Sequence, residues 1–182
     1  MKRPLIYIFT NVLILSLLVS CNPTPPTPTS QDEYDYGFIT RYGAYYAKQG
    51  IPNNVFMLDV YTPGLRLNDE GYIEGSGRNL CFSDVFTPST ATALQDGVVY
   101  TADSTGREDS FLPGQDFEGN INGAYLLDIK DNKVTAITLI SNGTFVISHV
   151  ADTMHIDFEL VTDKKTVYKA TYHARITYKN QQ

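Results

Sequence analysis

Two histidines and an aspartate near the end of the chain could bind a metal ion. Apolar and polar residues alternate over residues 154–160 and again over 168–178, and this period of two is typical of β-strands. If a tight loop joins the two strands, His155 lies opposite His173 on the solvent face, with Asp157 two residues along. Imidazole and carboxylate groups at this spacing suit a divalent transition metal. A solvated strand face has the same composition, so both interpretations stay open.

The same hairpin has a predicted register. A loop over 163–165 pairs Leu160 with Tyr168 on the apolar face and Glu159 with Lys169 on the polar face. A slip of one residue would place core side chains opposite solvent-facing ones. We therefore predict this register and not its neighbours.

A polar, glycine-rich segment in the middle of the chain carries alternating oxygen donors. Asp116, Glu118 and Asn120 have a spacing of the kind that calcium sites use. The segment lacks the EF-hand pattern of fixed Asp positions, a central Gly and a terminal Glu. The alternative is a solvated acidic loop, and we expect residues 104–123 to be irregular.

The beginning of the β-rich region is crowded with tyrosines. Tyr42, Tyr45 and Tyr46 could form an aromatic platform for a sugar or a peptide. A tyrosine ring is apolar and its hydroxyl needs water or a partner, so tyrosine serves both cores and binding surfaces. The alternative is that these side chains cover a core or a sheet edge. The chain has no Trp, which weakens the comparison with carbohydrate platforms.

Motifs of known catalytic mechanism do not occur in the sequence. It has no Gly-x-Ser-x-Gly elbow, no phosphate-binding loop and no His-Glu-x-x-His pair. Paired carboxylates could hydrolyse glycosidic bonds, but 20 acidic residues supply many pairs by chance. Cys81 has no Cys/His signature around it, and we expect it to be a small buried hydrophobe. The sequence favours a protein that is not an enzyme and that needs no cofactor.

The elements that must position these residues are β-strands. No segment beyond residue 20 sustains an apolar period of 3.6, whereas many alternate with period two. We predict an all-β domain, an antiparallel β-sandwich of about eight to ten strands, with a lipocalin-like β-barrel as the alternative. Asn142-Gly143 predicts a hairpin turn between two of the strands. The predicted strands are 42–46, 55–62, 79–86, 98–103, 125–129, 134–141, 144–149, and the hairpin of 154–160 with 168–178.

The start of the chain resembles a bacterial lipoprotein signal. Leu18–Cys21 is similar to the lipobox, in which the Cys becomes the lipidated first residue of the mature protein. The apolar stretch before it, about fifteen residues, is short for the roughly 20 that span a bilayer. With two basic residues ahead of it, this is typical of a cleaved signal peptide; an uncleaved anchor is the alternative. We expect acyl chains on Cys21 to attach the protein to a membrane.

These features divide the chain into three parts. Residues 1–20 are the predicted lipoprotein signal peptide. Residues 21–34 are the lipidated Cys and a proline-rich tether, which cannot be helical because proline lacks a backbone donor. Residues 35–182 are predicted to form a single all-β domain.

A proline-rich spacer after a lipobox, followed by a tyrosine-rich β domain, resembles the surface lipoproteins of Bacteroidota-type bacteria. Leu94–Thr101 is similar to a Leu-Pro-x-Gly-x-Tyr-Thr element of uncharacterised β-sandwich lipoproteins from that group, with Gln95 in place of Pro. The resemblance implies a lipid-anchored protein of the bacterial cell envelope, at the outer membrane, on its periplasmic or its outer face. Asp152-Thr153 resembles the O-glycosylation pattern of the same group, which implies modification of Thr153.

The charge of the chain limits its partners. It has 14 basic and 20 acidic residues, a net charge of −6, and loss of a signal peptide with two basic residues would make it more negative. Such a chain is repelled by nucleic acid and by anionic lipid. We expect a non-catalytic module that binds a glycan or a protein at the envelope. The alternatives are a structural or adhesion subunit of an envelope assembly and, third, a glycan-acting hydrolase.

Overall fold

The computed structural model describes residues 31–180, which contain fifteen β-strands and one 3₁₀ helix, η1 (Ala47–Gln49), and no α-helix. The all-β class is confirmed. This part of the chain holds no helix long and apolar enough to cross a membrane. The strands are β1 (Gln31–Tyr34), β2 (Tyr36–Gly43), β3 (Asn54–Tyr61), β4 (Leu65–Leu67), β5 (Ile73–Gly75), β6 (Gly77–Thr87), β7 (Val99–Ala102), β8 (Ser110–Phe111), β9 (Gln115–Phe117), β10 (Asn120–Asn122), β11 (Ala124–Lys130), β12 (Lys133–Val150), β13 (Thr153–Thr162), β14 (Val167–Ala174) and β15 (Thr177–Asn180).

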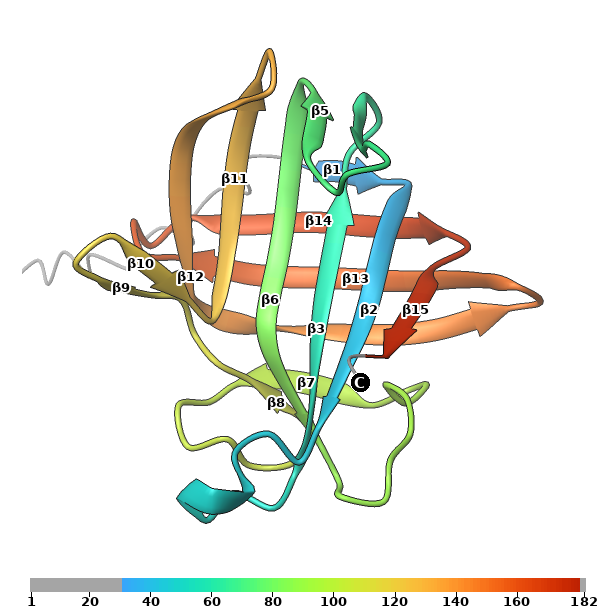
Figure 1. Cartoon of the computed structure of the whole chain (residues 1–182), viewed down its shortest axis with the longest axis vertical. Coiled ribbons are helices and arrows are strands. Elements are labelled where there is room, and N and C mark those ends of the chain that lie inside the picture. Colours follow the sequence, from blue (N-terminus) through green and yellow to red (C-terminus); the bar gives the residue numbers. More distant parts are fainter. Residues whose placement is uncertain (1–30, 181–182) are drawn as a thin grey trace, which may run out of the picture.

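Most of the strands belong to one eleven-stranded sheet. In Figure 1 β2, β3, β6 and β11 run along the long axis of the molecule, while β13 and β14 run across it. β12 pairs with β11 through its first half and with β13 through its second half, so it belongs to both groups. A ring of five strands, β12–β11–β6–β8–β7, closes on itself as a small barrel. A sandwich of two separate sheets is therefore not confirmed.

β12 changes direction where the sequence predicts a hairpin turn, and that turn prediction is wrong. Asn142-Gly143 lies inside one continuous strand, directly after a bulge at Ser141 in the pairing with β13. Gly143 has φ +122°, and a Cβ there would lie 2.4 Å from Glu159 O. A bulge bends a strand and increases its twist. Asn142-Gly143 thus forms a corner between the two groups of strands, because both halves of β12 have partners that hold them in the sheet.

A second corner joins the two ends of the described chain. β1 pairs in parallel with β14, for example Tyr34 with Tyr172, and β15 pairs in parallel with β2. Because β1 leads into β2 and β14 into β15, the two ends of the chain pass side by side from one group of strands to the other (Figure 1). Residues 31–34, which the sequence assigns to the tether, therefore form a strand of the sheet.

The main core lies between the two groups of strands. Its centre is aromatic: the ring of Phe82 lies 5.0 Å from that of Phe145 and 5.8 Å from that of Phe158. All three side chains are buried. The last hairpin has the predicted register, with Leu160 opposite Tyr168 and Glu159 opposite Lys169. Only this register keeps the apolar side chains of the hairpin in that core, because a slip of one residue would turn them toward solvent.

Three more predicted elements differ from the structure. The predicted strand over 168–178 is divided into β14, which ends at Ala174, and β15, which begins at Thr177 and pairs with β2. The predicted first strand over 42–46 is wrong, because β2 ends at Gly43 and the next residues form a turn and η1. The predicted irregular segment 104–123 contains β8, β9 and β10. In these last two places the sequence has tyrosines or glycines without a clear alternation, so long-range pairing decides the structure.

Candidate functional site

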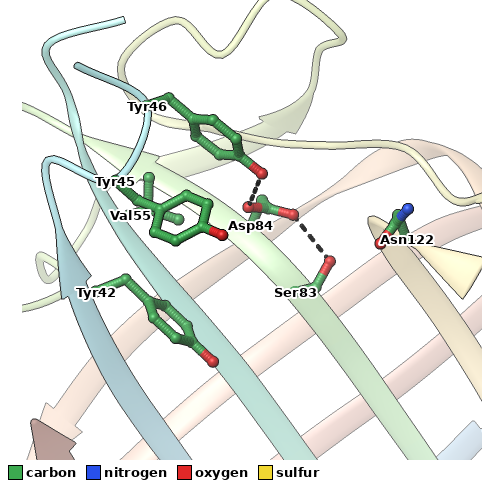
Figure 2. Close-up of a pocket in the computed structure, with 7 residues that line it drawn as sticks. All are labelled: Tyr42, Tyr45, Tyr46, Val55, Ser83, Asp84 and Asn122. Carbon is green, nitrogen blue, oxygen red and sulfur yellow. Dashed lines mark hydrogen bonds between the residues drawn. The ribbon is translucent and has the colours of Figure 1, made fainter. Parts of the chain in front are cut away.

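A cavity of about 260 Å³ lies at the end of the molecule near η1. We call it the tyrosine cavity, and Figure 2 shows its lining: tyrosine side chains on one side, Ser83 and Asp84 beside them, and Asn122 across from the tyrosines. The lining residues are Tyr42, Tyr45, Tyr46, Val55, Ser83, Asp84 and Asn122. The structure thus brings together the three tyrosines that the sequence offers as a ligand platform.

Two β-bulges beside β3 aim side chains into the tyrosine cavity. In β2, Tyr42 is an extra residue between partners of consecutive β3 residues. In β6, Ser83 and Asp84 together lie opposite the single residue Met57 of β3. A bulge breaks the alternation of faces and re-aims side chains, which is why bulges recur beside binding sites. Two adjacent β6 side chains can therefore line one cavity.

The other two tyrosines come from the connection between β2 and β3. The backbone N–H of Tyr45 donates to Gly43 O at 2.8 Å, which turns the chain sharply out of β2. The rings of Tyr45 and Tyr46 then meet at 4.9 Å and 89°, edge to face. Tyr46 also packs against Phe86, with ring centroids 5.9 Å apart. Tyr45 stays 63% exposed, so its ring is free to contact a ligand.

Hydrogen bonds hold the polar wall. The Tyr46 hydroxyl donates to Asp84 Oδ1 at 2.9 Å (Figure 2). Ser83 Oγ lies 2.9 Å from Asp84 Oδ2 and accepts from the backbone N–H of Gly123 at 2.8 Å. Gly123 has φ +76°, and a Cβ there would lie 2.1 Å from Pro113 O. The neighbouring loop, including Asn122, is therefore fixed against β6 by a position that only glycine fits.

The tyrosine cavity has a negative electrostatic character. Its lining includes no Lys, Arg or His, and within residues 31–180 Asp84 forms no ion pair. Burial, followed by the hydrogen bond and charge of Asp84, raises the pKa of Tyr46 above its usual value near 10. Burial and nearby acidic groups raise the pKa of Tyr42 in the same direction. The negatively charged phenolate form of both tyrosines is therefore disfavoured, as expected for a buried group beside another negative charge.

A second cluster of tyrosine and aspartate lies around β1, and we call it the β1 clamp. Arg78 Nη1 lies 2.8 Å from Asp32 Oδ2, and Arg78 Nε lies 2.7 Å from Asp128 Oδ1. The Tyr168 hydroxyl donates to Asp32 Oδ2 at 2.7 Å, and the Tyr34 hydroxyl bonds to that of Tyr168. Burial lowers the pKa of Arg78, but the hydrogen bonds and charges of the two aspartates outweigh it and raise that pKa. In the β1 clamp one guanidinium thus pairs with both aspartate carboxylates.

The predicted histidine pair lies on the outer face of β13 and β14. His155 is opposite His173, and their ring centroids are 4.0 Å apart. Asp157 lies opposite Thr171 on the same face. Within residues 31–180 no three His, Cys, Asp or Glu side chains gather as a metal site would require. The metal hypothesis therefore concerns the two imidazoles alone.

The acidic loop forms a small hairpin. Asp116 lies in β9, Asn120 in β10, and Glu118 in the turn between them with φ +54°. Asp116 Oδ1 accepts from the backbone N–H of Gly119 at 2.7 Å. The Asp116 carboxylate thus stabilises the turn of the hairpin. The geometry adds no support for the calcium hypothesis.

The remaining predicted positions divide between described and undescribed residues. Thr153 is the half-buried first residue of β13, directly after the exposed Asp152. Cys81 is buried in β6, as predicted, and burial raises its pKa well above the usual value. Cys21 and the predicted signal peptide lie outside the described residues.

The polar lining residues that sequence reasoning missed are Ser83, Asp84 and Asn122. Asp84 lies in Cys81–Phe86, where alternation alone places Ser83 and Asp84 on opposite faces. The bulge that unites them depends on the pairing with β3. Two consecutive polar residues in an otherwise apolar strand were the available signal.

Comparison of the chain with family models, with curated proteins and with solved structures gives no match.

Proposed function

We propose that this protein is a membrane-tethered, non-catalytic binding module of the bacterial cell envelope, and that its ligand binds in the tyrosine cavity. One observation carries the proposal: two bulges and one turn bring three tyrosines, Ser83 and Asp84 to a single concavity. Ligand sites are concave, rich in aromatic side chains and equipped with a few convergent polar groups. The tyrosine cavity has all three properties.

The size of the cavity limits what it can enclose. Small-molecule pockets have volumes of roughly 300–1,000 Å³, and this one has about 260 Å³. It suits one sugar ring or one side chain of a larger ligand. The exposed Tyr45 at its rim offers a further stacking surface for the part of the ligand that stays outside.

The position of the cavity fits a tethered module. β1, the described strand nearest in sequence to the predicted lipid anchor, lies in the upper part of the molecule in Figure 1, and η1 lies at the opposite, lower end. An acyl-anchored Cys21 followed by a proline-rich spacer would attach the end with β1. The tyrosine cavity would then face away from the lipid. We infer a barrel-like architecture for the whole domain, since the five-stranded ring and both corners connect the strand groups.

A ligand screen with matched tyrosine variants tests the proposal. Neutral saccharides, short peptides and small amines are added at high excess to the full chain in mild detergent, and the melting temperature is measured. A ligand that binds only the folded state must raise it. Tyr45→Ala should remove the rise, whereas Tyr72→Ala, which removes an equally exposed tyrosine (63% and 67%) outside the cavity, should keep it. Equal behaviour of the two variants, or no rise with any class, would overturn the proposed site.

The anchor needs a separate test. Cells expressing the chain are labelled with a fatty acid that carries a detectable tag. Incorporation into the protein that is lost in Cys21→Ser supports the lipidated form. Equal labelling of the two forms would exclude Cys21 as the acylated residue.

A further inference from the structure

We propose that the ligand of the tyrosine cavity carries a protonated amine, which pairs with the carboxylate of Asp84. This inference rests on the proposed function, and it adds the chemical class of the group that enters the cavity. It follows from the inventory of donors, acceptors and charges along the lining.

The polar wall has more acceptor capacity than the protein uses. An ionised carboxylate offers about four lone-pair sites, and Asp84 receives hydrogen bonds from the Tyr46 hydroxyl and from Ser83 Oγ. Ser83 Oγ also lies 3.1 Å from Gly123 O, so its single hydroxyl hydrogen is shared between two acceptors. Asp84 therefore keeps free lone pairs toward the cavity. A group with several N–H donors would fill them.

Charge favours the same kind of ligand. Asp84 is half-buried and has no cationic partner within the described residues. Hydroxyl donors solvate a carboxylate but do not neutralise it. Burying a charge is costly unless it is paired, so an incoming cation gains more here than at an exposed aspartate. A phosphate or carboxylate ligand would instead meet a negative wall without any Lys or Arg in the lining.

The aromatic wall is compatible with a cation. Tyr42, Tyr45 and Tyr46 present rings that meet edge to face, with centroid distances of 6.1 and 4.9 Å. Tyrosine rings attract cations through their negative faces and accept apolar ligand surface at the same time. An ammonium group on an aromatic or aliphatic body therefore satisfies both walls. Backbone hydrogen bonds and bulges hold these groups in place, so little reorganisation is needed before binding.

Isosteric ligand pairs test the inference. Benzylamine and benzyl alcohol have the same shape but differ in charge and donor number. Each is titrated by calorimetry into the full chain in mild detergent at neutral pH. Benzylamine should bind at least tenfold more tightly than benzyl alcohol, and higher salt should reduce the difference.

Carboxylate variants assign the effect to Asp84. Asp84→Asn keeps the acceptor for Tyr46 and removes the charge, so it should abolish the preference for benzylamine. Asp116→Asn removes a carboxylate outside the cavity and should leave the preference intact. Equal binding of benzylamine and benzyl alcohol by the wild-type chain, no binding of either, or an unchanged preference in Asp84→Asn would each overturn the inference. The proposed function would survive all three results if a neutral ligand still depended on Tyr45.

Discussion

The two ends of the molecule each bring tyrosine hydroxyl groups to an aspartate carboxylate, and they differ in what neutralises it. In the β1 clamp Asp32 receives the Tyr168 hydroxyl and also the guanidinium of Arg78. In the tyrosine cavity Asp84 receives the Tyr46 hydroxyl and no cation from the described chain. The first arrangement fixes a strand, and the second keeps an unpaired charge beside an open volume. The absence of a cationic partner for Asp84 among the described residues is thus what distinguishes the tyrosine cavity, the proposed binding site, from the β1 clamp.

The corner in β12 connects the two groups of strands, so its disruption should have the largest effect on the stability of the fold. Gly143→Ala places a Cβ 2.4 Å from Glu159 O at φ +122°. We expect a loss of about 3 kcal/mol in the free energy of unfolding, measured with urea. Gly119→Ala is the control, because Gly119 has φ +91° but no atom within 4 Å of a Cβ; it should cost about 1 kcal/mol. Equal costs would contradict the role of the corner.

Removal of the cation from the β1 clamp should have the next largest effect. Arg78→Ala leaves the carboxylates of Asp32 and Asp128 without their shared cation. We expect a loss of about 2 kcal/mol in the free energy of unfolding, less than for a fully buried pair, because water screens these partly exposed charges. Arg66→Ala breaks a more exposed pair with Asp35, whose side chains are 49% and 41% exposed, and should cost less than about 1 kcal/mol. Urea unfolding of both variants measures the difference. A smaller loss for Arg78→Ala than for Arg66→Ala would show that the clamp is not structural.

Removal of one carboxylate charge from the β1 clamp and one from the tyrosine cavity should change stability to different extents. Asp32→Asn should destabilise the fold by about 1 kcal/mol, because a neutral amide no longer forms the ion pair with Arg78. Asp84→Asn should change stability by less than about 0.5 kcal/mol, because the amide oxygen still accepts from the Tyr46 hydroxyl, and the Ser83 hydroxyl keeps Gly123 O as an acceptor. Thermal unfolding of the two variants under one set of conditions measures this contrast. Similar destabilisation by both would mean that Asp84 is a structural residue like Asp32.

A third aspartate, Asp59, should give the smallest effect, visible only as a pH dependence. Burial raises the pKa of Asp59 above its usual value near 3.8, although the hydrogen bonds from Tyr61 and Asn79 and the charge of Lys179 oppose this. A group whose pKa is raised on folding stabilises the fold below its unfolded pKa and loses that contribution as pH rises through the folded pKa. Stability should therefore fall as pH rises above about 4, and Asp59→Asn should make this fall shallower.

Urea midpoints across this pH range measure the slope. Asp157→Asn, an exposed carboxylate on β13, is the control and should keep the wild-type slope. A slope that is unchanged in Asp59→Asn would show that other groups cause the pH dependence.

The parts of the structure that the sequence predicts are those with regular alternation. The register that pairs Leu160 with Tyr168 follows from period two, because one face of that hairpin is buried. The bulges at Tyr42, at Ser83-Asp84 and at Ser141 depend on the pairing with a neighbouring strand and not on the local sequence alone. Local turn propensity therefore predicts a hairpin at Asn142-Gly143, although pairing of both halves of β12 keeps the strand continuous there.

The polar wall of the tyrosine cavity and strand β1 could not be predicted from the sequence for the same reason. The tyrosines of the cavity could be proposed from composition, but the polar wall could not, since it exists only where β6 bulges against β3. β1 is a polar segment, Gln-Asp-Glu-Tyr, without an apolar alternation. Its place in the sheet depends on Arg78 and Tyr168, which lie 46 and 136 residues from Asp32 along the chain.

Chemical-shift mapping tests most directly which of the two ends binds a ligand. Backbone amide resonances of the isotope-labelled chain are followed during titration with benzylamine. The perturbed amides should be those of residues 42–46, 83–84 and 122–123, and Asp84→Asn should remove the perturbation. Amides around Asp32, Arg78 and Tyr168 should stay unchanged. Perturbations centred on the β1 clamp, or equally strong in Asp84→Asn, would contradict the assignment of the tyrosine cavity as the binding site.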